Sequence, residues 1–383
     1  MTELKEHIKI TSGFALDSNL FNKTRGFPVI RIRDVDRGYT ETYYQGECDE
    51  KYIVKNGDLL VTMDGEFRAK VWNGGEAYLN QRVCKVEADE DRLSGRYLKY
   101  ALPQKLKEIE DKTSFVTVKH LSVNDIKEIN VHLPNLEDQE RIADLLDKAN
   151  SIRQKRRETL RLADEFLRST FLEMFGDPFL NPKNWNMEPI DRLKADEPYS
   201  IKAGPFGSAL KKEFYVKSGY KIYGQEQVIR DNFEFGDYYI TEEKYRELEN
   251  CKIESDDILI SLVGTFGEIS IVPKEFQPGI INPRLMKITL NKKKILPIFF
   301  KTLLKTNGIK TKLESLSHGG TMNIVNVGII KELEVPVPPL KLQEKFIEIH
   351  IKTEKLKKQY ETSLQESENL FNSLMQRAFR GEL

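Results

Sequence analysis

Cysteine is scarce in this chain, with three residues among 383. Cys48, Cys84 and Cys251 lie far apart, and none belongs to a CxxC pair. A disulfide framework needs several paired cysteines, and a thiolate zinc site needs closely spaced ones. The five histidines are also scattered, without the spacing of metal ligands. The sequence therefore predicts neither a disulfide-stabilised scaffold nor a metal site.

Net charge is the second absence, because 60 Lys+Arg balance 60 Asp+Glu. Without an overall positive charge, any nucleic-acid partner has to be bound by local basic patches. Long apolar runs are missing too, since no uninterrupted stretch approaches the ~20 residues that a membrane span requires. Residues 1–9 are charged and lack the apolar stretch of a signal peptide. We therefore expect a cytoplasmic protein.

The motifs of a DNA-modifying or ATP-driven enzyme are missing as well. The chain has no G-x-x-x-x-G-K-S/T phosphate loop and no glycine-rich cofactor loop after a predicted strand. A DNA adenine methyltransferase also needs an Asn/Asp-Pro-Pro-aromatic tetrapeptide to hold the flipped base, and Asn282–Leu285 has one proline and no aromatic residue. We expect no catalysis by this chain and no cofactor bound to it.

The most informative feature that is present is an internal repeat of about half the chain. The offset between matching segments drifts by only eleven residues, as a few loop insertions would produce. The matches are residues 26–30 with 219–223 at an offset of 193, residues 57–67 with 256–266 at 199, and residues 133–140 with 337–344 at 204.

Each half is predicted to be a mixed α/β globule followed by one long helix, so the fold class is mixed α/β (α+β). Helical patterns over 95–111 and 297–316 predict a shorter helix in each half. Short β-rich segments bounded by Gly, Asn, Asp and Pro predict strands. These strands are 52–54, 58–62, 82–86, 258–262, 269–272 and 285–290.

Leu136 to Phe175 and Leu340 to Phe379 predict two long helices, because neither contains glycine or proline. Apolar or small residues recur in steps of three and four, which predicts a pairing face of the coiled-coil type. We expect the two helices to pair antiparallel with the globules at opposite ends. The expected contact positions are Ile142, Leu145, Ala149, Ile152, Thr159, Ala163, Phe166 and Thr170, and Phe346, Ile349, Thr353, Leu356, Tyr360, Ser363, Ser367, Leu370 and Leu374.

Such a chain is pseudo-twofold, and DNA is itself nearly twofold symmetric. A covalent pseudo-dimer would meet two separate half-sites, and paired rigid helices would fix the spacing between them. Any duplicated protein has this internal symmetry, however, so the repeat alone leaves the function open.

Several motifs resemble the specificity (S) subunit of type I restriction-modification systems, and the resemblance covers nearly the whole chain. Each motif is weak alone, whereas their order, their duplication and their coupling to two long helices are specific. The motifs are Gly204–Lys211, Ser317–Ile324, Pro336–Glu344, Asn80–Val83 with its counterpart Asn282–Leu285, and Leu133–Ala143.

The resemblance implies two target-recognition domains that each read one part of an interrupted DNA sequence. It also implies that the helices dock modification subunits, two in number, and that restriction subunits join the complex. S-adenosylmethionine, ATP and Mg are then expected in the partner subunits. The expected boundaries are 1–135 for the first recognition domain, 136–177 for the central helix, 178–338 for the second recognition domain and 339–383 for the last helix.

The first half departs most from the family pattern. Thr11–Phe14 stands where the second half has Lys202–Ser208, and Lys119–Ser122 lacks the double glycine of Gly319–Gly320. Reading two different half-sites would require recognition domains that diverge in this way.

Fourteen residues are candidates for contact with DNA. Arg31 and Arg33 alternate along a predicted strand and would share one face, and arginine pairs with guanine in the major groove. Gln225 can pair with adenine or cytosine edges, and Lys211 and Lys212 can donate to phosphate. Each could instead be a solvated or ion-paired surface residue. The candidates are Arg31, Arg33, Arg68, Arg82, Lys119, His120, Lys202, Ser208, Lys211, Lys212, Gln225, His318, Thr321 and Asn323.

The sequence thus favours a non-catalytic subunit that gives a type I restriction-modification complex its DNA specificity. The alternative is a non-enzymatic coiled-coil adaptor that binds proteins through two globules. A stand-alone modifying enzyme is disfavoured by the missing motifs.

Overall fold

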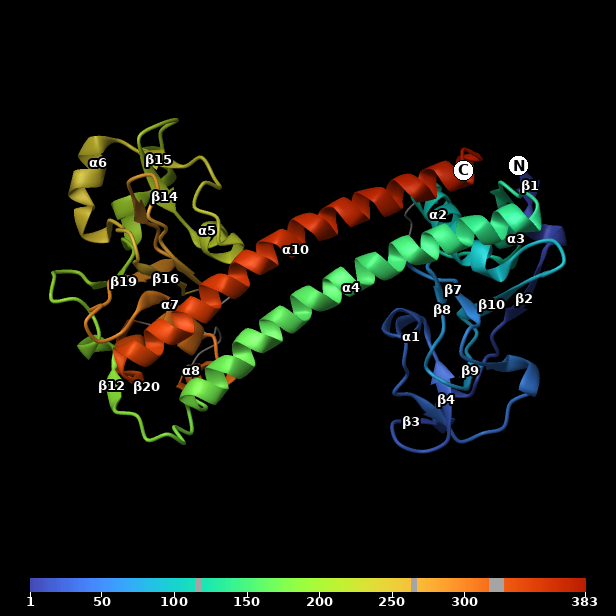
Figure 1. Ribbon diagram of the computed structural model, residues 1–383, viewed down its shortest axis with the longest axis horizontal. Helices are drawn as coiled ribbons and strands as arrows, with labels where there is room; N and C mark the ends of the chain where they lie inside the picture. Colours follow the sequence, from blue (N-terminus) through green and yellow to red (C-terminus); the bar gives the residue numbers. More distant parts are fainter. Residues whose placement is uncertain (114–118, 263–266, 317–326) are drawn as a thin grey trace. The chain divides into compact units, whose positions relative to one another are not determined.

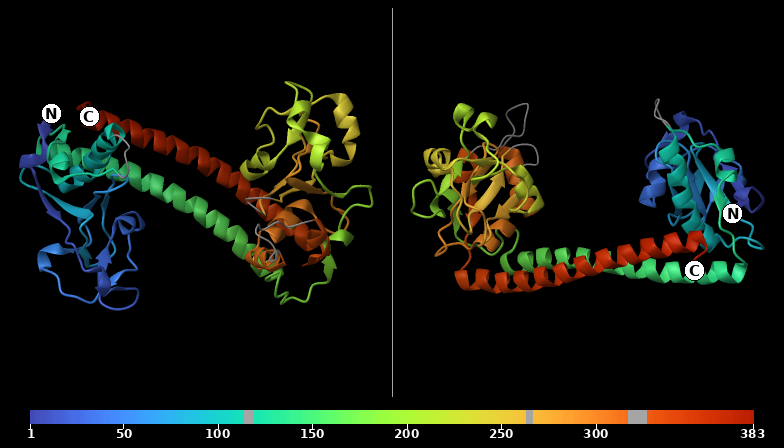
Figure 2. Two further views of the ribbon diagram at one scale, coloured as in Figure 1. Left: turned by 180° about the vertical axis from the view of Figure 1, so that it is seen from behind. Right: turned by 90° about the horizontal axis from the view of Figure 1, so that it is seen from above.

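The computed structural model describes residues 1–113, 119–262, 267–316 and 327–383. The chain divides into two compact units, of which the first comprises 1–159 with 360–383 and the second comprises 160–359. Each unit contains a mixed α/β globule and segments of two long helices (Figure 1). The helices are α4 (Leu136–Phe175) and α10 (Leu340–Arg380), which Figure 2 shows as unbroken ribbons. Both predicted long helices are confirmed.

The first unit is built on a four-stranded antiparallel sheet with the order β2-β10-β7-β8. A second sheet has the order β3-β5-β4-β9-β6, in which β4 and β9 are parallel. The strands are β1 (Thr2–Glu3), β2 (Ile8–Ser12), β3 (Phe21–Asn22), β4 (Phe27–Ile30), β5 (Tyr43–Tyr44), β6 (Ile53–Val54), β7 (Leu59–Thr62), β8 (Ala69–Val71), β9 (Ala77–Leu79), β10 (Val83–Ala88) and β11 (Asn130–Val131). The helices are α1 (Ile32–Arg37), α2 (Gly95–Lys112) and α3 (Val123–Lys127).

The second unit repeats this topology with a four-stranded sheet in the order β13-β19-β16-β17 and a smaller sheet in the order β15-β14-β18. Here β14 and β18 are the parallel pair. The strands are β12 (Met187–Pro189), β13 (Ile201–Ala203), β14 (Tyr220–Tyr223), β15 (Tyr239–Ile240), β16 (Ile258–Ser261), β17 (Ile269–Ile271), β18 (Gly279–Ile281), β19 (Leu285–Ile288) and β20 (Glu334–Pro336). The helices are α5 (Gln225–Arg230), α6 (Glu242–Glu247), α7 (Pro297–Leu304), α8 (Asn307–Leu316) and α9 (Val327–Glu332).

The central strand of each main sheet is buried on both faces. In β7, Leu59 and Val61 belong to the core formed with α2 and α4, while Leu60 belongs to the core shared with β4 and β9. Successive side chains of a strand point to opposite faces, so an uninterrupted apolar run fits this position. In β16, Ile258 and Leu259 divide in the same way between two cores.

The register of the sheets confirms the repeat residue by residue. Val83 of β10 lies opposite Thr62 of β7, and Leu285 of β19 lies opposite Ser261 of β16. Val83 corresponds to Leu285 at an offset of 202, and Thr62 corresponds to Ser261 at an offset of 199. The two halves therefore share strand order and pairing, as their sequences predict.

One predicted helix is interrupted. Residues 297–316 form α7 and α8 with a break at Lys305 and Thr306, rather than one helix. The Thr306 hydroxyl donates to Leu303 O at 2.7 Å, which gives that carbonyl a partner outside the helical pattern.

The long helices pair antiparallel within each unit, because residue numbers rise along one helix as they fall along the other. The pairing is held by side-chain contacts between the two helices within each unit. The contacts join Arg153 with Phe371 and Arg157 with Glu368 in the first unit, and Asp164 with Lys357 and Phe171 with Phe346 in the second.

Part of the predicted pairing face is exposed, which corrects the prediction. Leu145 and Ile152 of α4 are 39% and 48% exposed, and Leu370 of α10 is 56% exposed. Ile142 and Ala149 of the predicted face are buried, but the buried stripe also includes Leu146, which lies outside that face. The reason is that each helix packs on a globule as well as on the other helix, so the buried stripe is wider and turned relative to a plain coiled-coil seam.

Among the described residues, no helix is both long and apolar enough to cross a membrane.

Candidate nucleic-acid interface

One edge of the main sheet gathers four loops of the first unit, where β2 and β7 end and β10 and β8 begin. Backbone hydrogen bonds tie these loops together, since Gln81 N donates to Phe14 O at 3.0 Å and Met63 N donates to Arg82 O at 3.0 Å. A further bond runs from Leu121 N to Met63 O at 2.8 Å. We call this surface the first loop edge. It comprises residues 13–16, 63–68, 80–82 and 119–120.

The corresponding edge of the second unit is the second loop edge, which comprises residues 204–212, 262, 267–268 and 282–284. It is closed by an equivalent bond from Leu262 N to Arg284 O at 2.9 Å. The loops of both edges are therefore held by their backbones, which leaves their side chains free to differ.

A glycine at the start of each loop edge lets two backbones approach closely. Gly13 N donates to Val83 O at 3.0 Å, and Gly204 N donates to Leu285 O at 2.9 Å. A Cβ would lie 2.1 Å from Asn80 O at Gly13 and 1.9 Å from Asn282 O at Gly204. No other residue type fits without moving the chain. Here the divergent sequences of the two halves have the same structural requirement.

The first loop edge brings together four of the predicted residues, Arg68, Arg82, Lys119 and His120. Asp64 links two of them, because its carboxylate lies 3.2 Å from Nε of Arg82 and 2.6 Å from Nδ1 of His120. The side chains of Arg82 and His120 are more than half exposed. Asp64 thus holds two hydrogen-bonding groups in place at an open surface.

Arg68 and Lys119 are tied to neighbouring groups of the first unit. Nε of Arg68 lies 3.0 Å from Asp36, and the hydrogen bond to Glu66 raises the pKa of the arginine. Nζ of Lys119 donates to Glu110 O at 2.5 Å. These side chains are oriented by carboxylates and a carbonyl while remaining at the edge.

The prediction that Arg31 and Arg33 share one face of a strand is wrong. Strand β4 ends at Ile30, Arg31 caps α1, and Arg33 lies inside that helix. Residues two apart on a helix face different directions. The turn is fixed by Asp34, which accepts from Arg31 N at 2.9 Å. Both arginines are exposed, but they do not form one reading surface.

In the second unit the predicted residues are more dispersed. Gln225, the first residue of α5, donates through Nε2 to Oγ of Ser261 at 2.6 Å, where β16 enters the loop edge. Ser208, Lys211 and Lys212 are exposed in a loop with two short 3-10 turns, and Nζ of Lys211 lies 3.6 Å from Glu213.

Lys202 lies within β13 rather than in the loop. It stands opposite Lys287 in the sheet, with its Nζ 5.6 Å from the ring centroid of Tyr199. His318, Thr321 and Asn323 fall in 317–326, outside the residues that the structure describes.

Sequence reasoning missed two members of these edges, Asp64 and Arg284. Arg284 is exposed at the position that matches Arg82 at an offset of 202. The alignment of Asn80–Val83 with Asn282–Leu285 carried this signal. Asp64 could have been found from the same repeat, because it lies inside the matched segment 57–67.

A buried glutamine fixes the start of each long helix. Gln139 accepts from Ser94 N at 2.9 Å and donates to Arg92 O and Pro134 O at 3.0 and 2.8 Å. Gln343 does the same in the second unit, accepting from Leu296 N at 2.9 Å. It donates to the carbonyl oxygens of two residues there. The repeated Pro…Gln-Glu motif is thus a structural clamp between helix and globule.

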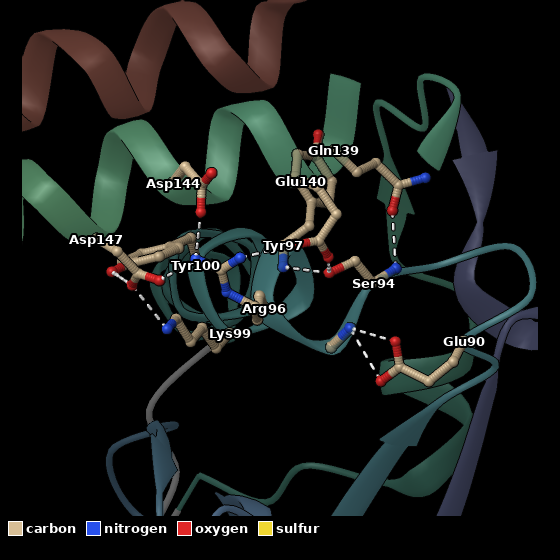
Figure 3. A network of polar contacts seen from close by, with 11 residues as sticks. Glu90, Ser94, Arg96, Tyr97, Lys99, Tyr100, Gln139, Glu140, Asp144 and Asp147 are labelled. Atoms are coloured by element: carbon tan, nitrogen blue, oxygen red, sulfur yellow. Dashed lines mark hydrogen bonds and ion pairs between the residues drawn. The ribbon is translucent and has the colours of Figure 1, made fainter. Parts of the chain in front are cut away.

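A charged network reinforces this clamp in the first unit (Figure 3). Arg96 of α2 lies 2.7 Å from Asp144 and 2.7 Å from Asp147 of α4. Asp147 also accepts from Lys99 at 2.7 Å and from the Tyr100 hydroxyl at 2.5 Å. Burial raises the pKa of Asp147, but these hydrogen bonds outweigh it and bring the pKa to about 2.

This architecture is that of the DNA-specificity proteins of type I restriction-modification systems, and the chain belongs to that family. The family described as "Type I restriction modification DNA specificity domain" matches residues 1–162 and 206–366. The chain provides DNA target specificity and is a non-catalytic subunit.

Among its relatives, the specificity subunit of the type I restriction enzyme EcoBI from Escherichia coli is 30% identical, over 98% of this chain and 84% of the relative. The specificity subunit of MjaVIII from Methanocaldococcus jannaschii is 21% identical, over 78% of this chain and 73% of the relative.

Solved structures share the fold. The crystal structure of the type I S subunit from M. genitalium has a TM-score of 0.58 at 16% identity, covering 99% of this chain and 95% of that one. A structure described for complex assembly and conformational transition of the type I R-M system has a TM-score of 0.57 at 14% identity, covering 100% and 97%.

Proposed function

We propose that the chain reads an interrupted DNA sequence, with one part read by each loop edge. The observation that carries this proposal is the pair of equivalent loop edges, which have the same backbone closure and different side chains. Equal scaffolds with unequal surfaces suit a target made of two unlike halves. We propose the recognition domains to be residues 1–135 and 178–338, with residues 136–177 and 339–383 as the helices that carry them.

Base contact in the first unit centres on Arg82. A guanidinium pairs with guanine through two parallel hydrogen bonds, and Asp64 holds this guanidinium at an exposed surface before DNA arrives. Arg68, Lys119 and His120 supply phosphate or base contacts around it. Arg31 and Arg33 remain candidates for backbone contact from α1.

In the second unit Gln225 is the candidate for an adenine edge, because its side chain is already positioned by Ser261. Ser208, Lys211 and Lys212 are placed in an exposed loop, which suits phosphate contact. Lys202 supports the sheet beneath that loop. His318, Thr321 and Asn323 stay candidates for phosphate or base-edge contact.

The exposed apolar rows of the helices support docking of partner subunits. In the first unit Leu145, Ile152 and Leu370 are exposed, and in the second unit the matching positions are the half-buried Ile349 and the exposed Leu356 and Phe166. All three pairs are related by the same offset of 204. We call these sets the first and second apolar rows. Two equivalent rows fit two copies of one partner.

That partner is the modification subunit, which carries the S-adenosylmethionine chemistry. Restriction subunits with ATP and Mg complete the complex, and the whole assembly works in the cytoplasm, where the DNA lies. This chain supplies the choice of sequence.

Selection from random-sequence DNA tests the proposal. The purified complex should enrich one motif with two defined parts separated by an undefined gap. Enrichment of no motif would favour the adaptor that binds proteins through its globules, and enrichment of an uninterrupted motif would contradict one part per loop edge.

A further inference from the structure

The most exposed large apolar side chain among the described residues lies on the second loop edge. This residue is Phe206, which is 77% exposed. Gly204 and Pro205 before it and Leu210 after it are buried. Burial of a phenylalanine ring is favourable, so a ring that stays in solvent between two buried anchors is available to a partner.

The ends of the loop that carries this ring are fixed. Gly204 N donates to Leu285 O at 2.9 Å, and Leu210 belongs to the core shared with β14 and β18. Between these anchors Gly207 has a φ of 60°, a left-handed conformation that turns the chain and that glycine adopts without strain. The loop therefore presents Phe206 to solvent from a defined position.

The first loop edge also has a phenylalanine after its closing glycine, but that ring has a neighbour. Phe14 directly follows Gly13, and its ring centroid lies 5.3 Å from that of Tyr52. Phe14 is 46% exposed, and the first charged residue after it is the acidic Asp17. The two edges therefore differ in how far an aromatic ring is offered to solvent.

The residues that follow Phe206 suit a polyanion. Ser208, Lys211 and Lys212 are exposed. Nζ of Lys211 lies 3.6 Å from Glu213, and water screens such an exposed pair, so the ammonium group can also contact phosphate. An apolar ring next to cationic side chains is complementary to DNA, whose bases lie between two rows of phosphates.

Asn282 places this loop beside Gln225, the candidate for an adenine edge. A Cβ at Gly204 would lie 1.9 Å from the carbonyl oxygen of Asn282. A Cβ at Gly224, directly before Gln225, would lie 2.7 Å from Nδ2 of the same asparagine. The loop that carries Phe206 and the helix that carries Gln225 thus flank one residue.

An A·T base pair offers a partner to each of these side chains. In the major groove adenine presents N7 and N6, which pair with an amide, and thymine presents an apolar methyl group on C5. Cytosine lacks this methyl group and presents an amino group. An apolar ring beside a glutamine therefore distinguishes thymine from cytosine while the amide pairs with adenine.

We propose that Phe206 packs against the C5 methyl group of a thymine in the major groove and thereby makes the second half of the target selective for an A·T pair. This inference rests on the proposed reading of DNA by the second loop edge. Gln225 contacts the adenine side, and Lys211 and Lys212 hold the adjoining phosphates.

The contact is tested with DNA that lacks the methyl group. The purified complex is bound to the duplex selected from random sequence, and then to the same duplex with deoxyuridine in place of every thymine of the second half. Base pairing is unchanged by this replacement, and only methyl groups are lost. Binding should weaken about fourfold, which corresponds to the burial of one methyl group.

Three variants assign the effect to the ring. Phe206→Ala should bind the thymine and deoxyuridine duplexes equally, because the group that contacts the methyl is gone. Phe206→Leu keeps an apolar side chain and should retain about half of the fourfold discrimination. Phe14→Ala, the matched variant of the first loop edge, should keep the full difference between the two duplexes.

The contradicting results are distinct from failure of the proposed function. Equal binding of both duplexes by the unchanged chain, a difference that survives Phe206→Ala, or a second half without an A·T pair would overturn the methyl contact alone. Loss of modification-subunit association in Phe206→Ala would assign the ring to a protein contact and overturn it as well. Enrichment of no motif from random sequence would refute the proposed function, and the methyl contact with it.

Discussion

The two units of this chain share a few fixed backbone contacts, and they differ in the side chains around these contacts. Gly13 and Gly204 close the loop edges with the same bonds, and Gln139 and Gln343 clamp the helices with the same partners. Around these fixed points the side chains diverge. The first unit holds its helix with the carboxylates around Arg96, whereas the second unit has Ile298 and Ile351 where the first has Arg96 and Asp147.

The difference shows which residues a duplicated recognition fold has to keep. Positions that bring two backbones together or that satisfy buried amides accept one residue type, because the alternatives clash or leave polar groups unpaired. Positions that only fill space or face solvent have several solutions. The contacts that select DNA belong to the second class, which is why the two halves can read different bases.

The largest expected effect comes from removing the shared clamp. Gln139→Leu and Gln343→Leu each leave buried backbone groups without partners, at about 1–3 kcal/mol per group, so each should destabilise its own unit by about 3–5 kcal/mol. Hydrogen exchange resolved by unit measures this. Gln365→Leu, on the exposed face of α10, is the control and should cost less than about 0.5 kcal/mol. A loss below about 1 kcal/mol in either unit would show that the clamp is not structural.

Next in size is the closure of the loop edges. Gly13→Ala and Gly204→Ala place a Cβ within 2.1 Å of a backbone oxygen, so the edge has to open. Each should weaken target binding at least about tenfold, or about 1.4 kcal/mol, and abolish base preference in its own half of the target. Gly95→Ala is the control, because the Cβ there meets only the flexible end of Glu90. Normal specificity in Gly204→Ala would contradict the role of the edge.

Arg82→Lys and Arg284→Lys test base recognition in the first and the second unit separately. Lysine keeps the charge but lacks the planar pair of donors, so each variant should relax preference at one position of its half by about 1–3 kcal/mol. Lys211→Ala with Lys212→Ala is the contrasting variant, which should weaken binding to all sequences and lower the salt slope by about 0.9 for each phosphate that is no longer neutralised. Competition binding at several salt concentrations measures both. Uniform weakening in Arg82→Lys would assign this arginine to phosphate.

The smallest expected effect is a pH dependence confined to the first unit. The folded pKa of Asp147, about 2, lies below its ordinary value of 3.8. Its contribution is therefore fully present above pH 3.8 and disappears as the pH falls towards 2. Since the carboxylate is about one-third exposed, the decrease in stability should be about 1–2 kcal/mol.

In Asp147→Asn, the free energy of unfolding of the first unit should fall less between pH 5 and pH 2.5 than it does in the unchanged chain. The second unit, with Ile351 at that position, should be unaffected by this variant. An unchanged slope in the first unit would show that the network adds nothing to stability.

Much of the fold could be predicted from the sequence because the repeat is tied to backbone requirements. The long helices were found from the absence of glycine and proline, and several strands of the two main sheets from short runs such as 58–62 and 258–262. The buried face of each helix was predicted only in part, because Leu145 and Leu146 are equally apolar and only packing on the globule decides which one is buried. The break at Lys305 and Thr306 was not predicted, because local bonds such as that from the Thr306 hydroxyl to Leu303 O leave no mark on the apolar periodicity.

The loop edges were predicted in part. Arg82 and His120 are far apart in sequence, and only the fold of the first unit brings both of them to Asp64. The prediction that Arg31 and Arg33 share one face was wrong, because an aspartate three residues beyond Arg31 starts a helix where the alternation predicted a strand.

The central claim is that each unit reads its own half of the target, and exchange of one recognition domain tests it most directly. Residues 1–133 are replaced with the corresponding segment of another member of the family, and the methylated motif in the host genome is determined by sequencing. The account predicts that one half of the motif changes to that of the donor while the other half stays the same. A motif that changes in both halves, or in neither, would contradict independent reading by the two loop edges.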